Sequence, residues 1–281
     1  MNNEEKIWVE KCLNDFKLKL ALRRYSNNTC HIYLSLFEKF ANKFCLQIDL
    51  LKESEICQYV LEQCNGKSYS FQNTLINAIK FYYEKVRYRK RKYYKIDRPK
   101  QERKLPHVID HDEVLQSIAK IENIKHKAII SLAYSTGIRV SEVVNIKIED
   151  VDSKRMMIQI KNAKGNKDRV VPLSKNILIL LIEYYKVQTK ENHKPSVYLF
   201  ENPYKKGVKY SAGSCQAVWK KFKINKQSTF HTLRHSCFTY LLENGTDIRI
   251  IKDLAGHENI KTTEGYTHVS KKLLSKVQLP V

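Results

Sequence analysis

The sequence predicts a mainly α-helical protein with two folded units joined by a basic linker. Apolar residues recur at helical spacing through residues 1–90, which favours a four-helix-type domain without strands. Prolines and a dense run of Lys and Arg are typical of a linker over residues 91–106. Two short strand-like segments interrupt the helical pattern of residues 107–281, so this larger unit is expected to be α-rich with a small antiparallel sheet.

In the first unit, local signals predict where helices begin and end. Ser26 is a good N-cap for a helix whose aromatic and leucine side chains repeat every three or four residues. The segment ESEICQYVLEQCNGK is typical of a short helix closed by Asn65-Gly66. A further helix is expected from about Ser70, and these signals together predict the helical domain.

In the second unit, Asp112 is expected to start a helix, and KHKAIISLAYSTG to form an apolar helix that ends at Gly137. Ser141 is expected to cap the short turn SEVVNI. Ser174 is expected to cap the helix KNILILLIEYYKV, which is apolar almost all round and is therefore predicted to be buried. The chain from 211 onward is expected to be helical, with stops at its glycines.

A β-hairpin is predicted between these helices. Residues 155–161 and 169–173 are expected to form short strands, and the loop between them contains Gly165, which can adopt a positive φ. Lys164 stands at the tip of this loop, where it could enter a groove. Lys161 and Lys167 are competing candidates for the same role.

The composition points to a polyanionic partner. Lys and Arg total 51 against 29 Asp and Glu, a net charge of +22, and each cation placed near a phosphate releases a counterion. The basic run over 85–106 carries interleaved Tyr and is expected to lie along a nucleic-acid backbone; the alternative is a solvated helix end. The apolar run over 177–182 stops at Glu183, far short of the roughly 20 residues that a membrane span needs. With no apolar signal core near the N-terminus, a cytoplasmic, nucleoid-associated protein is expected.

The seven cysteines are expected to be reduced thiols. Their number is odd and no C-x-x-C pair occurs, so disulfides and zinc are not expected. Cys57 and Cys64 lie two helical turns apart and are predicted to be buried on one face. The cysteines stand at positions 12, 30, 45, 57, 64, 215 and 237.

Several polar residues outside any expected core are candidates for a site. His231 and Arg234 lie three apart on the first turn of a helix, where free N–H groups and the helix dipole favour an anion. Such a pair alone is common in ordinary helices. Arg139 lies between two rigid elements, and Glu142 could orient its guanidinium or complement the N-terminus of its own helix.

The order and spacing of six residues resemble those of the tyrosine recombinase (phage integrase) family, in particular its Xer-like site-specific recombinases. The resemblance covers residues 105–270 and rests on the fragments TGIRVSE, KGNKDRVVPL, HTLRHS, LLENGTDIRIIKDLAGH and TTEGYTHV. Residues 1–90 resemble more loosely the DNA-binding, or core-binding, domain of that family. Two departures are Ala255 before Gly-His and Asn-Ala before Lys164. The six residues are Arg139, Lys164, His231, Arg234, His257 and Tyr266.

The resemblance implies a DNA breaking and rejoining enzyme. Tyr266 would be the nucleophile, giving a 3′-phosphotyrosine and a free 5′-hydroxyl, and Lys164 would protonate the departing oxygen. Arg139 and Arg234 would clamp the phosphate, as planar guanidinium groups suit. The two histidines of the set would bind the phosphate and handle the tyrosine proton, with their individual roles open. No carboxylate cluster accompanies the motif, so no cofactor, metal or ATP is expected.

The implied partners are double-stranded DNA at a specific site and further copies of the chain, as a dimer and then a tetramer that exchanges strands through a Holliday junction. The apolar tail over 271–281 is expected to dock on a neighbouring protomer, or else to pack in cis. The early first helix is expected to leave no separate arm-binding domain. Two alternatives remain open: a type IB topoisomerase-like relaxase, and a non-catalytic DNA-binding regulator with the same fold.

Overall fold

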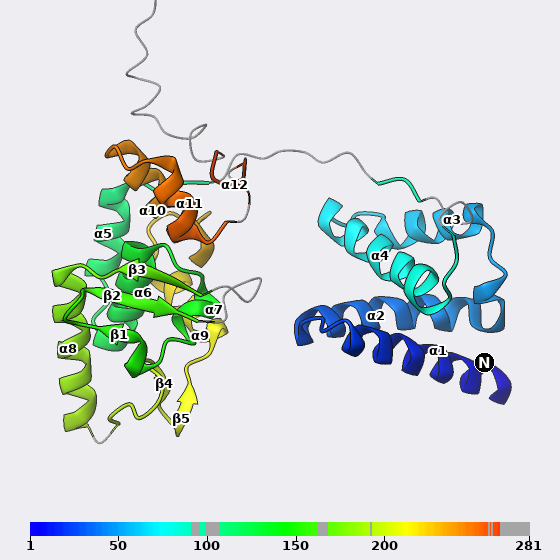
Figure 1. Ribbon diagram of the computed structural model, residues 1–281, viewed down its shortest axis with the longest axis horizontal. Helices are drawn as coiled ribbons and strands as arrows, with labels where there is room; N and C mark the ends of the chain where they lie inside the picture. Colours follow the sequence, from blue (N-terminus) through cyan, green and yellow to red (C-terminus); the bar gives the residue numbers. More distant parts are fainter. Residues whose placement is uncertain are drawn as a thin grey trace, which may run out of the picture. The chain divides into compact units, whose positions relative to one another are not determined.

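The computed structural model describes residues 1–90, 96–98, 107–161, 168–191, 193–257, 259 and 261–264 (Figure 1). The chain divides into two compact units, residues 1–103 and 104–281, which are described one after the other. No helix within these described ranges is long and apolar enough to cross a membrane.

In the described part of the first unit every regular element is a helix, as the sequence predicted. Ser26 caps α2 with its hydroxyl, and Ser68 rather than Ser70 caps α4. The last turn of α4 widens into a π-helix. The elements are α1 (Asn3–Leu22), α2 (Asn27–Phe44), the 3₁₀ turn η1 (Cys45–Asp49), α3 (Glu53–Cys64), α4 (Tyr69–Phe81) and the π-helical η2 (Tyr82–Val86).

Aromatic side chains fill the core of this unit. The ring of Phe16 on α1 stacks on Phe37 of α2 with centroids 4.3 Å apart, and both side chains are fully buried. The sequence predicted that the thiols of Cys57 and Cys64 are buried, and this prediction overestimated their burial. Both are only half-buried against the core, because α3 covers the other helices with one face and these residues lie at its margin.

The second unit combines helices with two small antiparallel sheets. Its helices are α5 (His111–Ala119), α6 (Ile124–Thr136), α7 (Val140–Val143), the 3₁₀ turn η4 (Ile148–Asp150), α8 (Lys175–Lys190), α9 (Ala212–Phe222), α10 (Phe230–Glu243), α11 (Ile248–Ala255) and α12 (Lys261–Glu264). Its strands are β1 (Val151–Asp152), β2 (Met157–Ile160), β3 (Arg169–Pro172), β4 (Glu201–Asn202) and β5 (Lys205–Lys209).

The predicted hairpin is present as the pair β2 and β3, with Met157 opposite Pro172 and Ile160 opposite Arg169. β1 adds a third antiparallel strand, in the order β1-β2-β3. Ile158 and Val171 alternate inward into the core, as the two-residue period of a strand requires. The second sheet, β4 and β5, was not predicted from the sequence.

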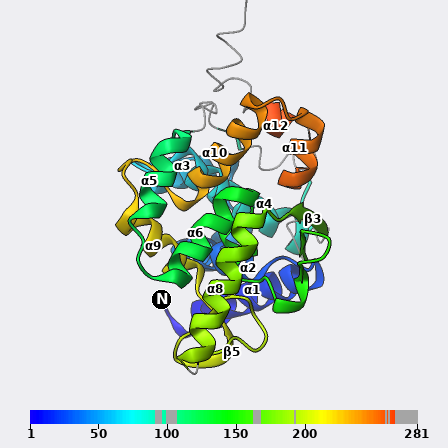
Figure 2. The same cartoon turned by 90° about the vertical axis from the view of Figure 1, so that its left-hand side faces the viewer.

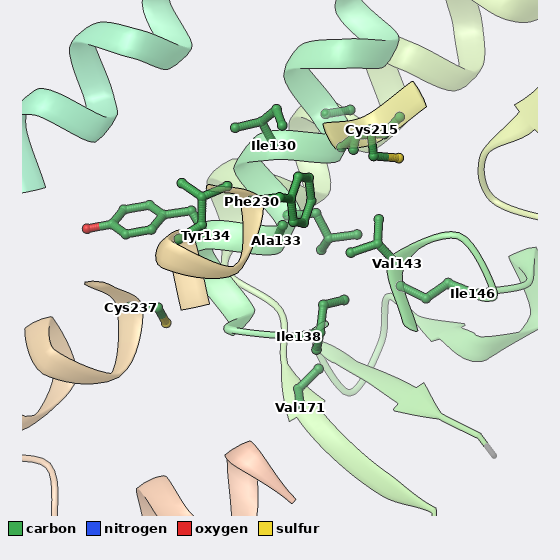
Figure 3. Close-up of a cluster of buried hydrophobic side chains, with 14 of the residues drawn as sticks. Ile130, Ala133, Tyr134, Ile138, Val143, Ile146, Val171, Cys215, Phe230 and Cys237 are labelled. Carbon is green, nitrogen blue, oxygen red and sulfur yellow. The ribbon is translucent and has the colours of Figure 1, made fainter. Parts of the chain in front are cut away.

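Helix α6 forms the centre of the core. Helices α8, α9 and α10 all contact it, and Figure 2 shows α6 and α8 side by side. Figure 3 shows Ala133 of α6 among Phe230 of α10, Cys215 of α9 and Val143 of α7, all of them buried. Gly137 ends α6 in the left-handed conformation, as predicted.

Two predictions for this unit were wrong. Ser174 does cap α8, but the helix is not buried all round: Ile179 is 55% exposed, because α8 lies against α6 with a single face. Helix α7 begins at Val140, so its cap residue is Arg139 and not Ser141. The Glu142 carboxylate accepts the backbone N–H of Arg139, and this bond fixes the start of the helix two residues earlier than expected.

Candidate active site

The site is built around the junction of α6 and α7. Gly137 turns the chain sharply, and its carbonyl oxygen accepts a hydrogen bond from Nη1 of Arg234, with 2.7 Å between nitrogen and oxygen. Arg139 follows two residues later. The turn therefore brings two guanidinium groups that lie far apart in the sequence to one corner of the fold.

Arg234 extends inward from α10 and is only 2% exposed. Its Nη2 donates to the carbonyl of Ala255 at 2.5 Å and to Nε2 of His257 at 3.2 Å. Its guanidinium lies over the ring of Phe238, 4.9 Å from the centroid. Arg234 thus joins the end of α6, its own helix and the segment after α11.

Glu142 is a buried carboxylate between two arginines. Its Oε1 accepts Nη1 of Arg139 at 2.9 Å, and Arg169 donates to both of its oxygens, at 3.0 and 2.8 Å. Burial opposes the charged form, but the bonds from Arg169 and from the Arg139 backbone outweigh it and lower the pKa of Glu142 to about 2. Both roles that the sequence left open for Glu142 are present, because it orients Arg139 and also caps α7.

Arg169 was missed by the sequence analysis. It begins β3, and its Nε donates to the Leu254 carbonyl at 2.8 Å, so it ties the hairpin to the end of α11. Gly256 has a φ of +61°, and a Cβ there would lie 3.3 Å from Cδ and Nη1 of Arg169. One signal could have revealed Arg169: it lies two residues before the buried Val171, on the inward face of its strand, where a charge requires a partner.

His257 directly follows Gly256. Burial, and then the positive charges of Arg234, Arg139 and other neighbours, lower the pKa of His257 to about 4, so the imidazole is neutral near pH 7. Its Nδ1 lies 3.0 Å from the hydroxyl of Thr263 on α12, which is fully buried. Thr263 is a second residue that the sequence analysis missed.

His231 is partly exposed at the start of α10, while Arg234 is buried below it. Partial burial of its ring and the nearby charges of Arg234 and Arg139 lower the pKa of His231. His235, one turn further, meets the His231 ring edge to face with centroids 4.7 Å apart, and burial lowers the pKa of His235 to about 4. The expected pair of imidazoles thus comes with a third, which was not predicted.

Lys164 and Tyr266 lie outside the described residues. Of the lysines that competed with Lys164, Lys161 is described: its Nζ lies 2.6 Å from Oδ1 of Asp150 and 3.6 Å from Oε1 of Glu149. The hydrogen bond that Lys161 donates to Asp150 raises the pKa of Lys161. A lysine held in this way is a poorer proton donor, which favours another lysine of the loop.

Residues 107–272 match the phage integrase family, and residues 12–92 match the N-terminal SAM-like domain of phage integrases. The chain belongs to the phage integrase family. Among its relatives, tyrosine recombinase XerA of Pyrococcus horikoshii is 35% identical over 98% of this chain and 94% of that protein. Tyrosine recombinase XerD of Staphylococcus epidermidis is 31% identical over 96% of each. The resemblance to tyrosine recombinases is confirmed, and the chain is an enzyme of this DNA breaking and rejoining class.

Solved structures share the recombinase fold. The crystal structure of XerA recombinase, 27% identical, covers 95% of this chain and 96% of its own with a TM-score of 0.54. The XerH site-specific recombinase bound to difH in a post-cleavage complex, 22% identical, covers 88% of this chain and 78% of its own with a TM-score of 0.70. A lambda integrase tetramer bound to a Holliday junction, 15% identical, covers 92% and 76% with a TM-score of 0.68. These matches confirm the mainly α-helical fold class with small antiparallel sheets.

Proposed function

We propose that this recombinase cleaves double-stranded DNA at a specific site through Tyr266 and exchanges strands by way of a Holliday junction. The observation that carries the proposal is Arg234, which links the Gly137 turn beside Arg139 to His257. Guanidinium and imidazole groups from three remote segments therefore gather at one corner of the fold. Such a group of permanent cations and hydrogen-bond donors suits a phosphate whose charge grows in the transition state.

In the proposed reaction, the Tyr266 hydroxyl oxygen attacks phosphorus and the bond from phosphorus to the 5′ oxygen breaks. The tyrosine proton passes to a base of the site, and Lys164 gives a proton to the departing 5′ oxygen. Arg139 and Arg234 bind the non-bridging oxygens, and His231 and His257 complete the set. Because the 3′-phosphotyrosine keeps the energy of the broken bond, a 5′-hydroxyl can reseal the strand without ATP.

The proposed partners follow from charge and from the relatives. A net charge of +22 favours a DNA backbone, and the XerH and lambda integrase structures hold DNA, one of them as a tetramer. We assign DNA binding to residues 1–90 as well as to the catalytic domain over 107–281, with 91–106 as the basic linker. Dimers on each site would pair as a tetramer.

The nucleophile is tested by trapping it. On a nicked duplex that carries the site, found by footprinting DNA beside the gene, the wild-type chain is expected to form a covalent adduct that survives denaturing electrophoresis. Tyr266→Phe is expected to form none, because a phenyl ring has no hydroxyl to attack phosphorus. The matched control is Tyr204→Phe, since Tyr204 is 92% exposed on the turn between β4 and β5, and it is expected to behave as wild type. An undiminished adduct with Tyr266→Phe would refute the assignment, and no wild-type adduct would favour a non-catalytic regulator.

The tail is tested by its removal. A chain that lacks residues 271–281 is expected to bind a single site with unchanged affinity but to form no paired complex of two sites, since these apolar residues would dock on a neighbour. Native gels with one and with two labelled duplexes measure both steps. Unchanged recombination by the shortened chain would show that the tail packs in cis. Relaxation of supercoiled DNA without partner exchange by the full chain would favour the relaxase alternative.

A further inference from the structure

We propose that Thr263 is a positioning residue of the cleavage site: it accepts the hydrogen bond of Nδ1 of His257 and so holds the ring in the tautomer that Arg234 selects, with an unprotonated Nε2 toward Arg234. The tautomer is a property of the chain without DNA. Its meaning for catalysis rests on the proposed function, so the two are tested separately below.

The tautomer follows from the donors around the ring. A guanidinium can only donate hydrogen bonds, and Nη2 of Arg234 lies 3.2 Å from Nε2 of His257, so Nε2 must be the acceptor. The single proton of a neutral imidazole then resides on Nδ1. That nitrogen lies 3.0 Å from Oγ1 of Thr263, which accepts the hydrogen bond from its N–H. Neutrality itself follows from burial and from the surrounding cations, which lower the pKa of His257 to about 4.

Thr263 is placed to link two parts of the machinery. It belongs to α12, which packs against α11, and its side chain is fully buried. Tyr266 follows it by three residues in the sequence. Seating α12 against α11 therefore supplies the partner of Nδ1. One hydrogen bond therefore couples the position of α12 to the orientation of the His257 ring.

This coupling has a chemical use. When Arg234 turns its N–H toward the phosphate, the unprotonated Nε2 is released and can accept the proton that the attacking hydroxyl loses as its oxygen bonds to phosphorus. The opposite tautomer would turn an N–H toward Arg234 and leave Nδ1 to face the Thr263 hydroxyl as an acceptor. Partners of this type, which fix a histidine through its other nitrogen, typically change activity roughly 10- to 100-fold when removed.

The tautomer is measured first, by NMR of the DNA-free full chain labelled with ¹⁵N-histidine, with the His257 signals assigned from a His257→Gln variant. Wild type and Thr263→Ser are expected to show a protonated Nδ1 and an unprotonated Nε2. Thr263→Val keeps the shape and removes the acceptor, so its Nδ1 proton is expected to lose its hydrogen bond, to move upfield and to exchange faster with water. The control Thr262→Val changes an exposed neighbour and is expected to behave as wild type. A protonated Nε2 in wild type, or an unchanged shift and exchange rate of the Nδ1 proton in Thr263→Val, would overturn the proposal.

Adduct formation on the nicked duplex is measured second. Thr263→Val is expected to slow it roughly 10- to 100-fold without a change in the Kd for DNA, and Thr263→Ser is expected to restore it. If wild type forms an adduct and Thr263→Val matches its rate, Thr263 has no positioning role. If wild type forms none, the proposed function fails while the NMR result for the tautomer stands by itself.

Discussion

Replacing Gly137 by alanine is expected to destabilise the second unit by about 2–4 kcal/mol and to remove cleavage activity. Gly137 has a φ of +64°, which costs an L-residue about 1 kcal/mol or more. Its new Cβ would lie 2.6 and 2.7 Å from two ring carbons of Phe238, and overpacking a core costs about 1–3 kcal/mol. Phe238 is fully buried beneath the Arg234 guanidinium, so moving the ring moves the arginine as well.

Gly245→Ala is the matched control for this prediction. Gly245 ends α10 in the same unit with a φ of +85°, but a Cβ there meets no atom within 4 Å. It is expected to lose only about 1 kcal/mol and to keep its activity. Urea unfolding followed by circular dichroism gives the free energies, and the nicked duplex gives the activity. Equal losses in the two variants would show that contact with Phe238 is unimportant.

The helical frame was predictable because its signals are local. Serine caps such as Ser26 and Ser174 and the left-handed Gly137 act within a few residues of where they stand. The exposed faces of α8 were not predictable in this way. An apolar sequence shows that a helix can be buried, whereas the number of neighbours that cover it is decided by the rest of the fold.

The β4–β5 sheet was missed because no strand pattern specifies it. The Glu201 carboxylate, 5% exposed, accepts backbone N–H groups of Val197 and of Gly207 at 2.7 and 2.9 Å, so it joins the preceding loop to β5. Burial opposes its charge, but these backbone bonds lower the pKa of Glu201 to about 2. A single buried acid that organises a loop has no periodic signature.

The candidate site was only partly predictable, because some of its residues follow a sequence pattern and others depend on remote contacts. Arg139, Arg234 and His257 stood out by order and spacing, and the structure brings them together. Arg169 did not stand out, since it is one of 51 basic residues and its role depends on Glu142 and Leu254, both far away in the sequence. Contacts of this kind are decided by tertiary structure and not by the residues beside them.

Replacing Glu142 by glutamine is expected to destabilise the second unit by about 3–5 kcal/mol at pH 7. Removing one partner of a buried ion pair leaves the remaining charge uncompensated, and here Arg139 and Arg169 both lose their carboxylate. The side chains of Glu142 and Arg169 are only 6% and 10% exposed, so water cannot readily take the place of the lost carboxylate. Even at a low temperature at which Glu142→Gln remains folded, adduct formation is expected to be slower than in wild type, because Arg139 also loses the carboxylate that orients it.

Acid titration separates the charge of Glu142 from its shape. Its pKa lies at about 2 in the folded chain against an ordinary 4.5, so its contribution is complete above pH 4.5 and is lost as the pH falls toward 2. Over that window the wild-type chain should lose about 3 kcal/mol that Glu142→Gln does not, at about 1.4 kcal/mol per unit of pKa. Glu149→Gln is the control, since that side chain is 65% exposed and its lysine contacts are 3.6 Å long. Parallel acid curves for wild type and Glu142→Gln would show that hydrogen bonding, which glutamine keeps in part, and not charge, holds the two arginines in place.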